Sequence, residues 1–148
     1  MKIFAVVLIA LLFSVTNCFS QTQTQLTESS ANDLKITELK MDSVFKKIQM
    51  IYAKDITFIK NIKLSQHSWN TYYLNQINTM FPKYPSDHHY GSMLSMCVTS
   101  YSKKLVALRI QELEQWLIGR EDGDCLSSIK PKDELPAYTP YRSEDDIP

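Results

Sequence analysis

Apolar residues recur at helical spacing through most of the first half of the chain. Residues 21–81 contain neither glycine nor proline, which is typical of continuous helix. The apolar stripe runs through Met41, Phe45, Ile48, Tyr52, Ile56, Ile59 and Ile62, and then through Gln66, Trp69, Tyr73, Ile77 and Met80. A single helix would extend about 70 Å, more than a compact domain of this size spans. We therefore expect a break near residues 61–65, with Ser65 capping a second helix. One long helix packed only in its middle is the alternative.

A further helix is predicted after a loop of about ten residues, 82–91, which Pro82, Pro85 and Gly91 punctuate. Ser92 is a suitable N-cap, and Gly119 stands where a glycine would end the helix. Two neighbouring apolar stripes lie between them: Leu94, Val98, Tyr101, Leu105 and Leu108, and then Val106, Ile110, Leu113 and Leu117. Together they make a wide apolar face. The pattern predicts an all-α fold, a small antiparallel bundle of two or three long helices.

The two ends of the chain differ from this helical region. Residues 1–20 resemble a signal peptide, with Lys2 before an apolar run too short to span a bilayer, and we place the cleavage after Ser20. Residues 21–32 are predicted to be a flexible spacer and residues 33–125 the helical domain. Residues 126–148, rich in proline and acidic groups, are expected to form a tail that is mostly disordered or loosely appended. The protein is therefore expected to be periplasmic or extracellular. A lipid anchor through Cys18 is the less favoured alternative, because Val-Thr-Asn precedes that cysteine.

The balance of basic and acidic side chains excludes some classes of binding partner. The whole chain carries 16 basic and 16 acidic side chains, and removing residues 1–20 takes away only Lys2. Such a balance argues against nucleic acid and against a polybasic membrane surface. Residues 21–119 carry 11 basic and 8 acidic groups, whereas residues 120–148 carry 4 and 8. No segment after the first 20 residues is apolar enough to predict a transmembrane helix.

The motifs of common enzymes and metal sites are not found in the sequence. His88 and His89 adjoin Asp87, but neighbours in an extended loop point apart and no third ligand is evident. Neither Gly-x-Ser-x-Gly nor a glycine-rich phosphate loop occurs. We therefore predict no catalysis, no cofactor and no metal. Binding to a protein partner remains, and the loop offers the candidate residues Lys83, Tyr84, Ser86, His88, His89 and Tyr90. An ordinary connector between helices is the alternative interpretation of this loop.

Two cysteines, Cys97 and Cys125, remain once the signal peptide is removed. An oxidising compartment favours a disulfide between them. A straight helix from Cys97 to Gly119 would separate its ends by about 33 Å, whereas the residues onward to Cys125 reach back only about 20 Å. The tentative pairing therefore needs a helix that begins after Cys97, a kink, or unusually extended ends. Free thiols or an intermolecular bridge are the alternatives.

Several short motifs within residues 41–125 resemble one known family. Ser65-Gln66-His67-Ser68-Trp69 is similar to an Ala-Gln-x-x-Trp element, and Trp116-Leu117-x-Gly119 ends the similarity region. The other matching positions are Ala53-Lys54-Asp55, Phe58-Ile59-Lys60-Asn61, Tyr72, Pro82, Tyr90-Gly91-Ser92, Cys97, Leu105, Arg109 and Leu113. This layout resembles the LprI-type lysozyme-inhibitor family in its Bacteroidetes-like secreted form. The chain departs from it at Tyr72-Tyr73-Leu74, where the family commonly has an Arg-Asp pair and a nearby cysteine.

The resemblance implies a helical binding protein that protects the bacterial wall by inhibiting lysozyme. A lysozyme cleft contains two catalytic carboxylates. A protruding loop that offers Lys, Tyr and His donors could occupy that cleft and exclude the glycan. A non-catalytic envelope interaction or assembly module is the alternative function. Gln66, Trp69 and Trp116 are expected to be structural core residues, with Gln66 a candidate partner for the Trp69 indole N–H. Arg109, Glu112 and Glu114 are expected to be ordinary charges on a helix surface.

Overall fold

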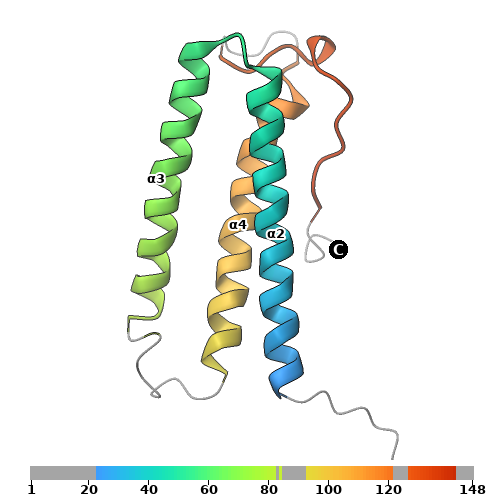
Figure 1. Cartoon of the computed structure of the whole chain (residues 1–148). Coiled ribbons are helices and arrows are strands. Elements are labelled where there is room, and N and C mark those ends of the chain that lie inside the picture. Colours follow the sequence, from blue (N-terminus) through green and yellow to red (C-terminus); the bar gives the residue numbers. More distant parts are fainter. Residues whose placement is uncertain (1–22, 83, 85–92, 122–126, 143–148) are drawn as a thin grey trace, which may run out of the picture.

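Three long helices form an up–down–up bundle in the computed structural model, which describes residues 23–82, 84, 93–121 and 127–142 (Figure 1). The helices are α2 (Gln23–Ile51), α3 (Ile56–Met80) and α4 (Leu94–Ile118), and a short 3₁₀ helix, η2 (Lys132–Glu134), follows. Consecutive helices run antiparallel, so α2 and α4 lie parallel to each other. No β-strand is present in these ranges, which confirms the predicted small all-α bundle. None of the described helices combines the length and apolarity needed to cross a membrane.

The core lies mainly between α2 and α4. Ile48 of α2 and Ile110 and Leu113 of α4 are fully buried. Burial of a side chain of this size stabilises a fold by about 1.5–3 kcal/mol. The core cluster comprises Met41, Val44, Ile48, Tyr52, Phe58, Ile62, Val106, Ile110, Leu113 and Leu117. Most of the predicted stripes of the two halves of the chain therefore meet in one core, but Ile56, Met80 and Leu108, which also belong to these stripes, are exposed.

The break between the first two helices falls earlier than predicted. Helix α2 ends at Ile51, and Asp55 caps α3 by accepting a hydrogen bond from the Phe58 N–H at 2.8 Å. Ser65, the predicted cap, lies inside α3, where its hydroxyl accepts a hydrogen bond from Arg109. Both the break at residues 61–65 and the single long helix are therefore wrong. Asp is a strong N-cap residue, and one capped turn at residues 52–55 is enough to reverse the chain.

The predicted flexible spacer, residues 21–32, also differs from the structure, because α2 already begins at Gln23. Contacts with α4 hold this end of the helix. The hydroxyls of Ser30 and Thr99 form a hydrogen bond of 2.5 Å, and Lys103 lies 3.8 Å from the carboxylate of Asp33. Polar residues thus link the two helices where apolar ones are sparse. The signal peptide, its cleavage site and Cys18 lie outside the described residues.

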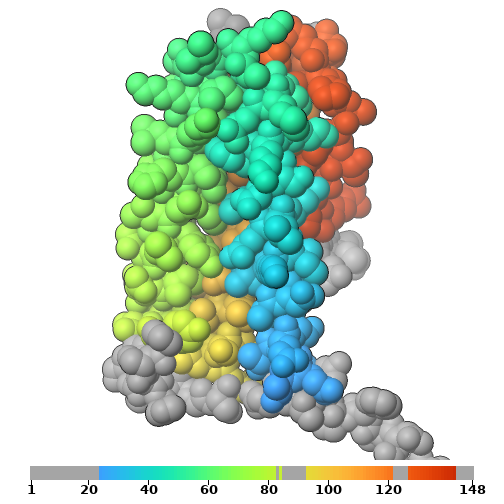
Figure 2. Space-filling model, in the orientation of Figure 1, coloured from blue at the N-terminus to red at the C-terminus, as the bar shows by residue number. Residues whose placement is uncertain are grey.

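The third difference concerns residues 127–142, here named the C-terminal strap, which we expected to belong to a tail that is mostly disordered or loosely appended. The strap turns back beside α2 (Figure 1) and covers one flank of that helix in the space-filling view (Figure 2). Arg120 and Lys132 begin this return, since the Arg120 N–H donates to the Lys130 carbonyl and the Lys132 N–H to the Arg120 carbonyl. Proline limits the conformations that such a segment can adopt, and two tyrosines supply apolar surface. The prediction from composition took into account neither the restriction by proline nor the apolar surface of the tyrosines.

Gly119 ends α4, as its position in the sequence predicted. Its φ is 85°, a value that other residues rarely adopt. A Cβ atom at this position would lie 2.8 Å from the Cα of Lys132 and 2.9 Å from a methyl group of Leu135. The glycine therefore both stops the helix and lets the strap cross close to it.

Candidate functional site

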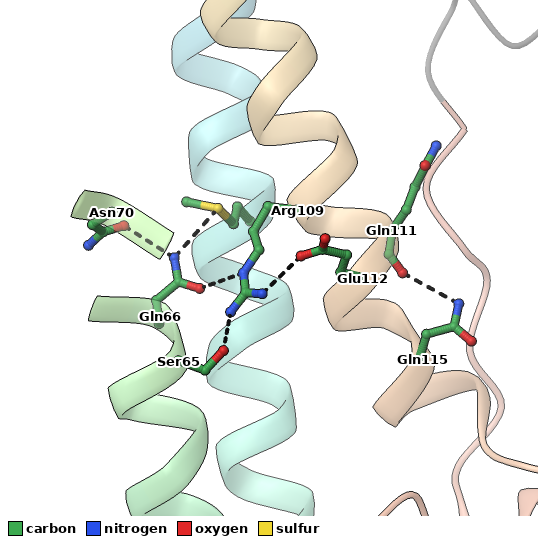
Figure 3. A network of polar contacts seen from close by, with 8 residues as sticks. Ser65, Gln66, Asn70, Arg109, Gln111, Glu112 and Gln115 are labelled. Atoms are coloured by element: carbon green, nitrogen blue, oxygen red, sulfur yellow. Dashed lines mark hydrogen bonds and ion pairs between the residues drawn. The ribbon is translucent and has the colours of Figure 1, made fainter. Parts of the chain in front are cut away.

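A buried arginine joins α3 to α4 (Figure 3). Arg109 of α4 is only 7% exposed, and its Nε donates to Oε1 of Gln66 at 3.1 Å. One terminal nitrogen donates to the hydroxyl of Ser65 at 3.0 Å, and the other pairs with the carboxylate of Glu112 at 2.9 Å. All three guanidinium nitrogens thus have partners, which offsets much of the desolvation cost of burying the charge.

Gln66 extends this network to all three helices. Its amide nitrogen lies 3.8 Å from the sulfur of Met41 in α2 and 3.4 Å from the side-chain oxygen of Asn70. The Trp69 ring packs against the core, with its centroid 6.0 Å from the Arg109 guanidinium. Trp69 also stacks on Tyr73, with 5.4 Å between the ring centroids. Ser65, Gln66, Trp69 and Arg109 therefore form one cluster, here named the arginine cluster.

The arginine cluster corrects two sequence expectations. Arg109 is buried rather than a surface charge. Gln66 was a candidate partner for the Trp69 indole N–H, but its side chain bonds Arg109 across the bundle. The sequence held one signal for this burial, because Arg109 adjoins Ile110 on the wide apolar face of α4. Glu112, by contrast, is exposed as expected.

An aromatic group packs where α3 begins and α4 ends. The rings of Tyr52 and Phe58 lie 4.4 Å apart, and those of Phe58 and Trp116 lie 6.1 Å apart. The Tyr52 hydroxyl donates to the Trp116 carbonyl at 3.1 Å and accepts from the Lys130 N–H of the strap at 3.0 Å. Beside these rings lies a pocket of about 330 Å³, here named the aromatic pocket. Its lining comprises Asp55, Thr57, Phe58, Asn61, Ile62, Ser65, Trp116 and Ser128.

The strap is fastened to a second buried charge, Glu114 of α4, which is 2% exposed. One of its carboxylate oxygens accepts from the Tyr138 hydroxyl at 2.5 Å and from the Tyr141 N–H at 2.8 Å. The Tyr138 ring in turn faces Lys47 of α2, whose amino group lies 4.7 Å from the ring centroid. Glu114 was predicted to be a surface charge, so this contact is a further correction. Two features of the sequence pointed to this contact: Glu114 lies on the apolar face of α4, four residues after Ile110 and three before Leu117, and the proline-rich segment contains two tyrosines.

Burial raises the pKa of Tyr138 above its ordinary value of 10.0, and the hydrogen bond to Glu114 and the negative charge of Glu114 raise it further. The folded state therefore holds the phenol proton more tightly than the unfolded state. The resulting stability is fully present below pH 10.0 and is lost as the pH rises through the raised folded pKa. We expect urea unfolding to show this alkaline loss, and Tyr138→Phe to make it shallower. Tyr72→Phe, which alters an exposed phenol, is the control, and an unchanged slope in Tyr138→Phe would contradict the assignment.

Most of the predicted partner-binding loop lies outside the described residues, namely Lys83, Ser86, His88, His89 and Tyr90. Tyr84 is described and exposed, and its N–H donates to the Phe81 carbonyl at 3.0 Å. His67 is exposed on α3. The described ranges contain no group of His, Cys, Asp and Glu side chains arranged to hold a metal ion.

The tentative disulfide is not formed in this structure. Cys97 is an exposed free thiol in the first turn of α4, and Cys125 lies outside the described residues. Helix α4 begins before Cys97, at Leu94, and runs to Ile118, so Cys97 and Gly119 are separated by about 33 Å. The structure therefore has neither the late start of α4 nor the kink in α4, two of the three ways in which pairing could have been reached.

Comparison of this chain with models of known protein families, with curated proteins and with solved structures found no match. The geometry of the chain and the resemblance of its short motifs are therefore what indicates a function.

Proposed function

We propose that this chain is an exported, non-catalytic binding protein that blocks a lysozyme and so protects the bacterial wall. The observation that carries this proposal is the arginine cluster. Gln66 and Arg109 are 43 residues apart in the sequence, yet they form a direct hydrogen bond beside Trp69. The resemblance to LprI-type inhibitors rests on these same residues. Contact among them supports the interpretation that the motifs specify one shared structural unit.

The structural roles of the buried charged residues favour a binding protein over an enzyme. Arg109 holds α3 against α4, and Glu114 holds the strap, so both groups are engaged in structural hydrogen bonds. Acid–base catalysis needs groups that can reach a substrate. The bundle, residues 21–119, carries an excess of basic side chains, which favours approach to the acidic cleft of a lysozyme. Tyr84 is the exposed described residue of the proposed contact loop.

Purified protein comprising residues 21–148 is expected to slow lysozyme-driven clearing of a cell-wall suspension in proportion to the amount of protein added. The double variant Tyr84→Ala with His88→Ala should weaken inhibition at least about tenfold, as the loss of one good contact would. A matched control is Tyr72→Ala with His67→Ala, which removes an exposed tyrosine and an exposed histidine from α3. Both double variants should keep the helical circular dichroism spectrum. If the two double variants inhibited lysozyme equally well, the interface would lie outside the loop.

A non-catalytic envelope module that binds another surface protein is the second candidate function. The observation in its favour is the outward face of α4, where Met93 is 54% and Leu108 49% exposed. A shallow depression between them includes Met96 and Ala107. Folded protein that leaves lysozyme fully active at large molar excess would favour this second function.

A further inference from the structure

The aromatic pocket combines an apolar floor with a polar rim. Phe58 and Ile62, at 7% and 4% exposure, form the floor, and the half-buried Trp116 forms a wall. The rim bears the amide of Asn61, the carboxylate of Asp55 and the hydroxyls of Thr57, Ser65 and Ser128. Its volume, about 330 Å³, lies at the small end of the range for ligand pockets. No lysine or arginine is among the described residues that line the pocket, which disfavours an anionic ligand.

The pocket is held in shape before any ligand arrives. Tyr52 fixes the backbone of Trp116, while the Trp116 indole N–H lies 3.5 Å from the Ser128 hydroxyl of the strap. Asp55 is held by its capping bond to Phe58. A preorganised site loses less conformational entropy when it binds. The strap therefore contributes to the pocket as well as to the fold.

Ser65 belongs to both the arginine cluster and the pocket. Its oxygen accepts from Arg109, so its own proton remains to be donated to another acceptor. The nearby Asn61 amide offers both a donor and an acceptor. A complementary ligand would have an apolar face for Trp116 and Phe58, and an edge of hydroxyl and amide groups for the rim. A sugar ring with an acetamido group has this chemistry, because its methyl suits the floor and its amide suits Asn61 and Ser65.

We infer that the aromatic pocket binds a neutral, N-acetylated glycan, with one sugar ring stacked on Trp116. This activity goes beyond lysozyme inhibition, since it would hold the chain on an acetamido-sugar polymer such as the wall itself. It does not depend on the loop of residues 82–91. Binding of the soluble glycan requires no lysozyme, so this inference can fail while the proposed inhibition stands, and the reverse is also possible.

The experiment uses Trp116 as the reporter. The chain has two tryptophans, and Trp69→Phe leaves Trp116 as the only one. Titration of that variant with tri-N-acetylchitotriose is expected to give a saturable change in tryptophan emission. Adding Asn61→Ala should weaken binding about tenfold, as expected for a lost ligand hydrogen bond. Asn75→Ala removes an exposed amide of α3 outside the pocket and should leave binding unchanged.

Calorimetry on the unsubstituted protein supplies the same affinity without relying on the Trp69→Phe background. Trp116→Ala should abolish binding. Thr57→Ala is the second variant, for the case that Trp116→Ala does not fold. Thr57 is an exposed rim residue, so its replacement should leave the fold intact and weaken binding of the glycan. Absence of saturable binding, or equal affinity in Asn61→Ala, would overturn the inference. Equal affinity for cellotriose, which has hydroxyls but no acetamido groups, would also overturn it.

Discussion

Replacing Glu114 with alanine is expected to lower the free energy of unfolding by about 3 kcal/mol and to release the C-terminal strap. The variant loses two hydrogen bonds to a charged acceptor, each worth about 1.5–3 kcal/mol. It also leaves the Tyr138 hydroxyl and the Tyr141 N–H without their partner. Relief from burying a carboxylate offsets part of this loss. Urea unfolding followed by circular dichroism measures the change, and hydrogen exchange shows whether the strap is released.

Glu114→Gln separates hydrogen bonding from charge. Both bonds in the structure reach the same oxygen of Glu114, which the glutamine carbonyl can replace. This variant should therefore lose less than about 1.5 kcal/mol, the contribution of one neutral hydrogen bond. Gln111→Ala, on the exposed side of the same helix, is the matched control and should stay close to the parent protein. If Glu114→Gln were as unstable as Glu114→Ala, charge rather than hydrogen bonding would hold the strap.

Replacing Arg109 with alanine is expected to cost about 3 kcal/mol and to loosen α3 more than α2. The guanidinium connects α4 to Ser65 and Gln66 of α3, and its loss leaves the Gln66 carbonyl oxygen without this donor. Contacts between α2 and α4 do not depend on this side chain, because they are mainly apolar. Hydrogen exchange should therefore accelerate most in α3. Mass spectrometry of the exchanged protein resolves the three helices.

Two further substitutions sharpen the test of Arg109. Arg109→Lys should recover little, because one ammonium group cannot reproduce the fork that bonds Ser65, Gln66 and Glu112 together. Lys104→Ala removes an exposed charge from the same helix and should leave exchange unchanged. Equal acceleration in all three helices of the Arg109→Ala protein would show that Arg109 stabilises the bundle as a whole rather than fastening α3.

Periodicity predicted the helical core well, because burial on one face of a helix leaves a repeating trace in the sequence. Ile48 and Tyr52 from the first stripe meet Ile110 and Leu113 from the second. The break between α2 and α3 was harder to place, since Asp55 and Ser65 are both suitable caps and no glycine or proline decides between them. Tertiary packing decides which residue is the cap, because the Ser65 hydroxyl accepts a hydrogen bond from Arg109 of another helix.

The site was predictable only in part, because its central contacts join segments far apart in the sequence. Gln66, Trp69 and Trp116 were predicted to be structural residues from their motifs, and all three are half-buried. The burial of Arg109 and Glu114 depends on partners from α3 and from the strap, which the periodicity of α4 alone does not reveal. The proline-rich composition of the strap gave no indication that Tyr138 would dock on the bundle, where its hydroxyl donates a hydrogen bond to Glu114.

The hydrogen bond from Lys130 to Tyr52 joins residues 78 positions apart. The strap also bonds Glu114 of α4, so it can dock fully only once α2 and α4 lie side by side. The bundle should therefore assemble before the strap docks. The aromatic pocket, which includes Ser128 of the strap, is then completed only in the last stage of folding, so partly folded molecules lack the complete pocket.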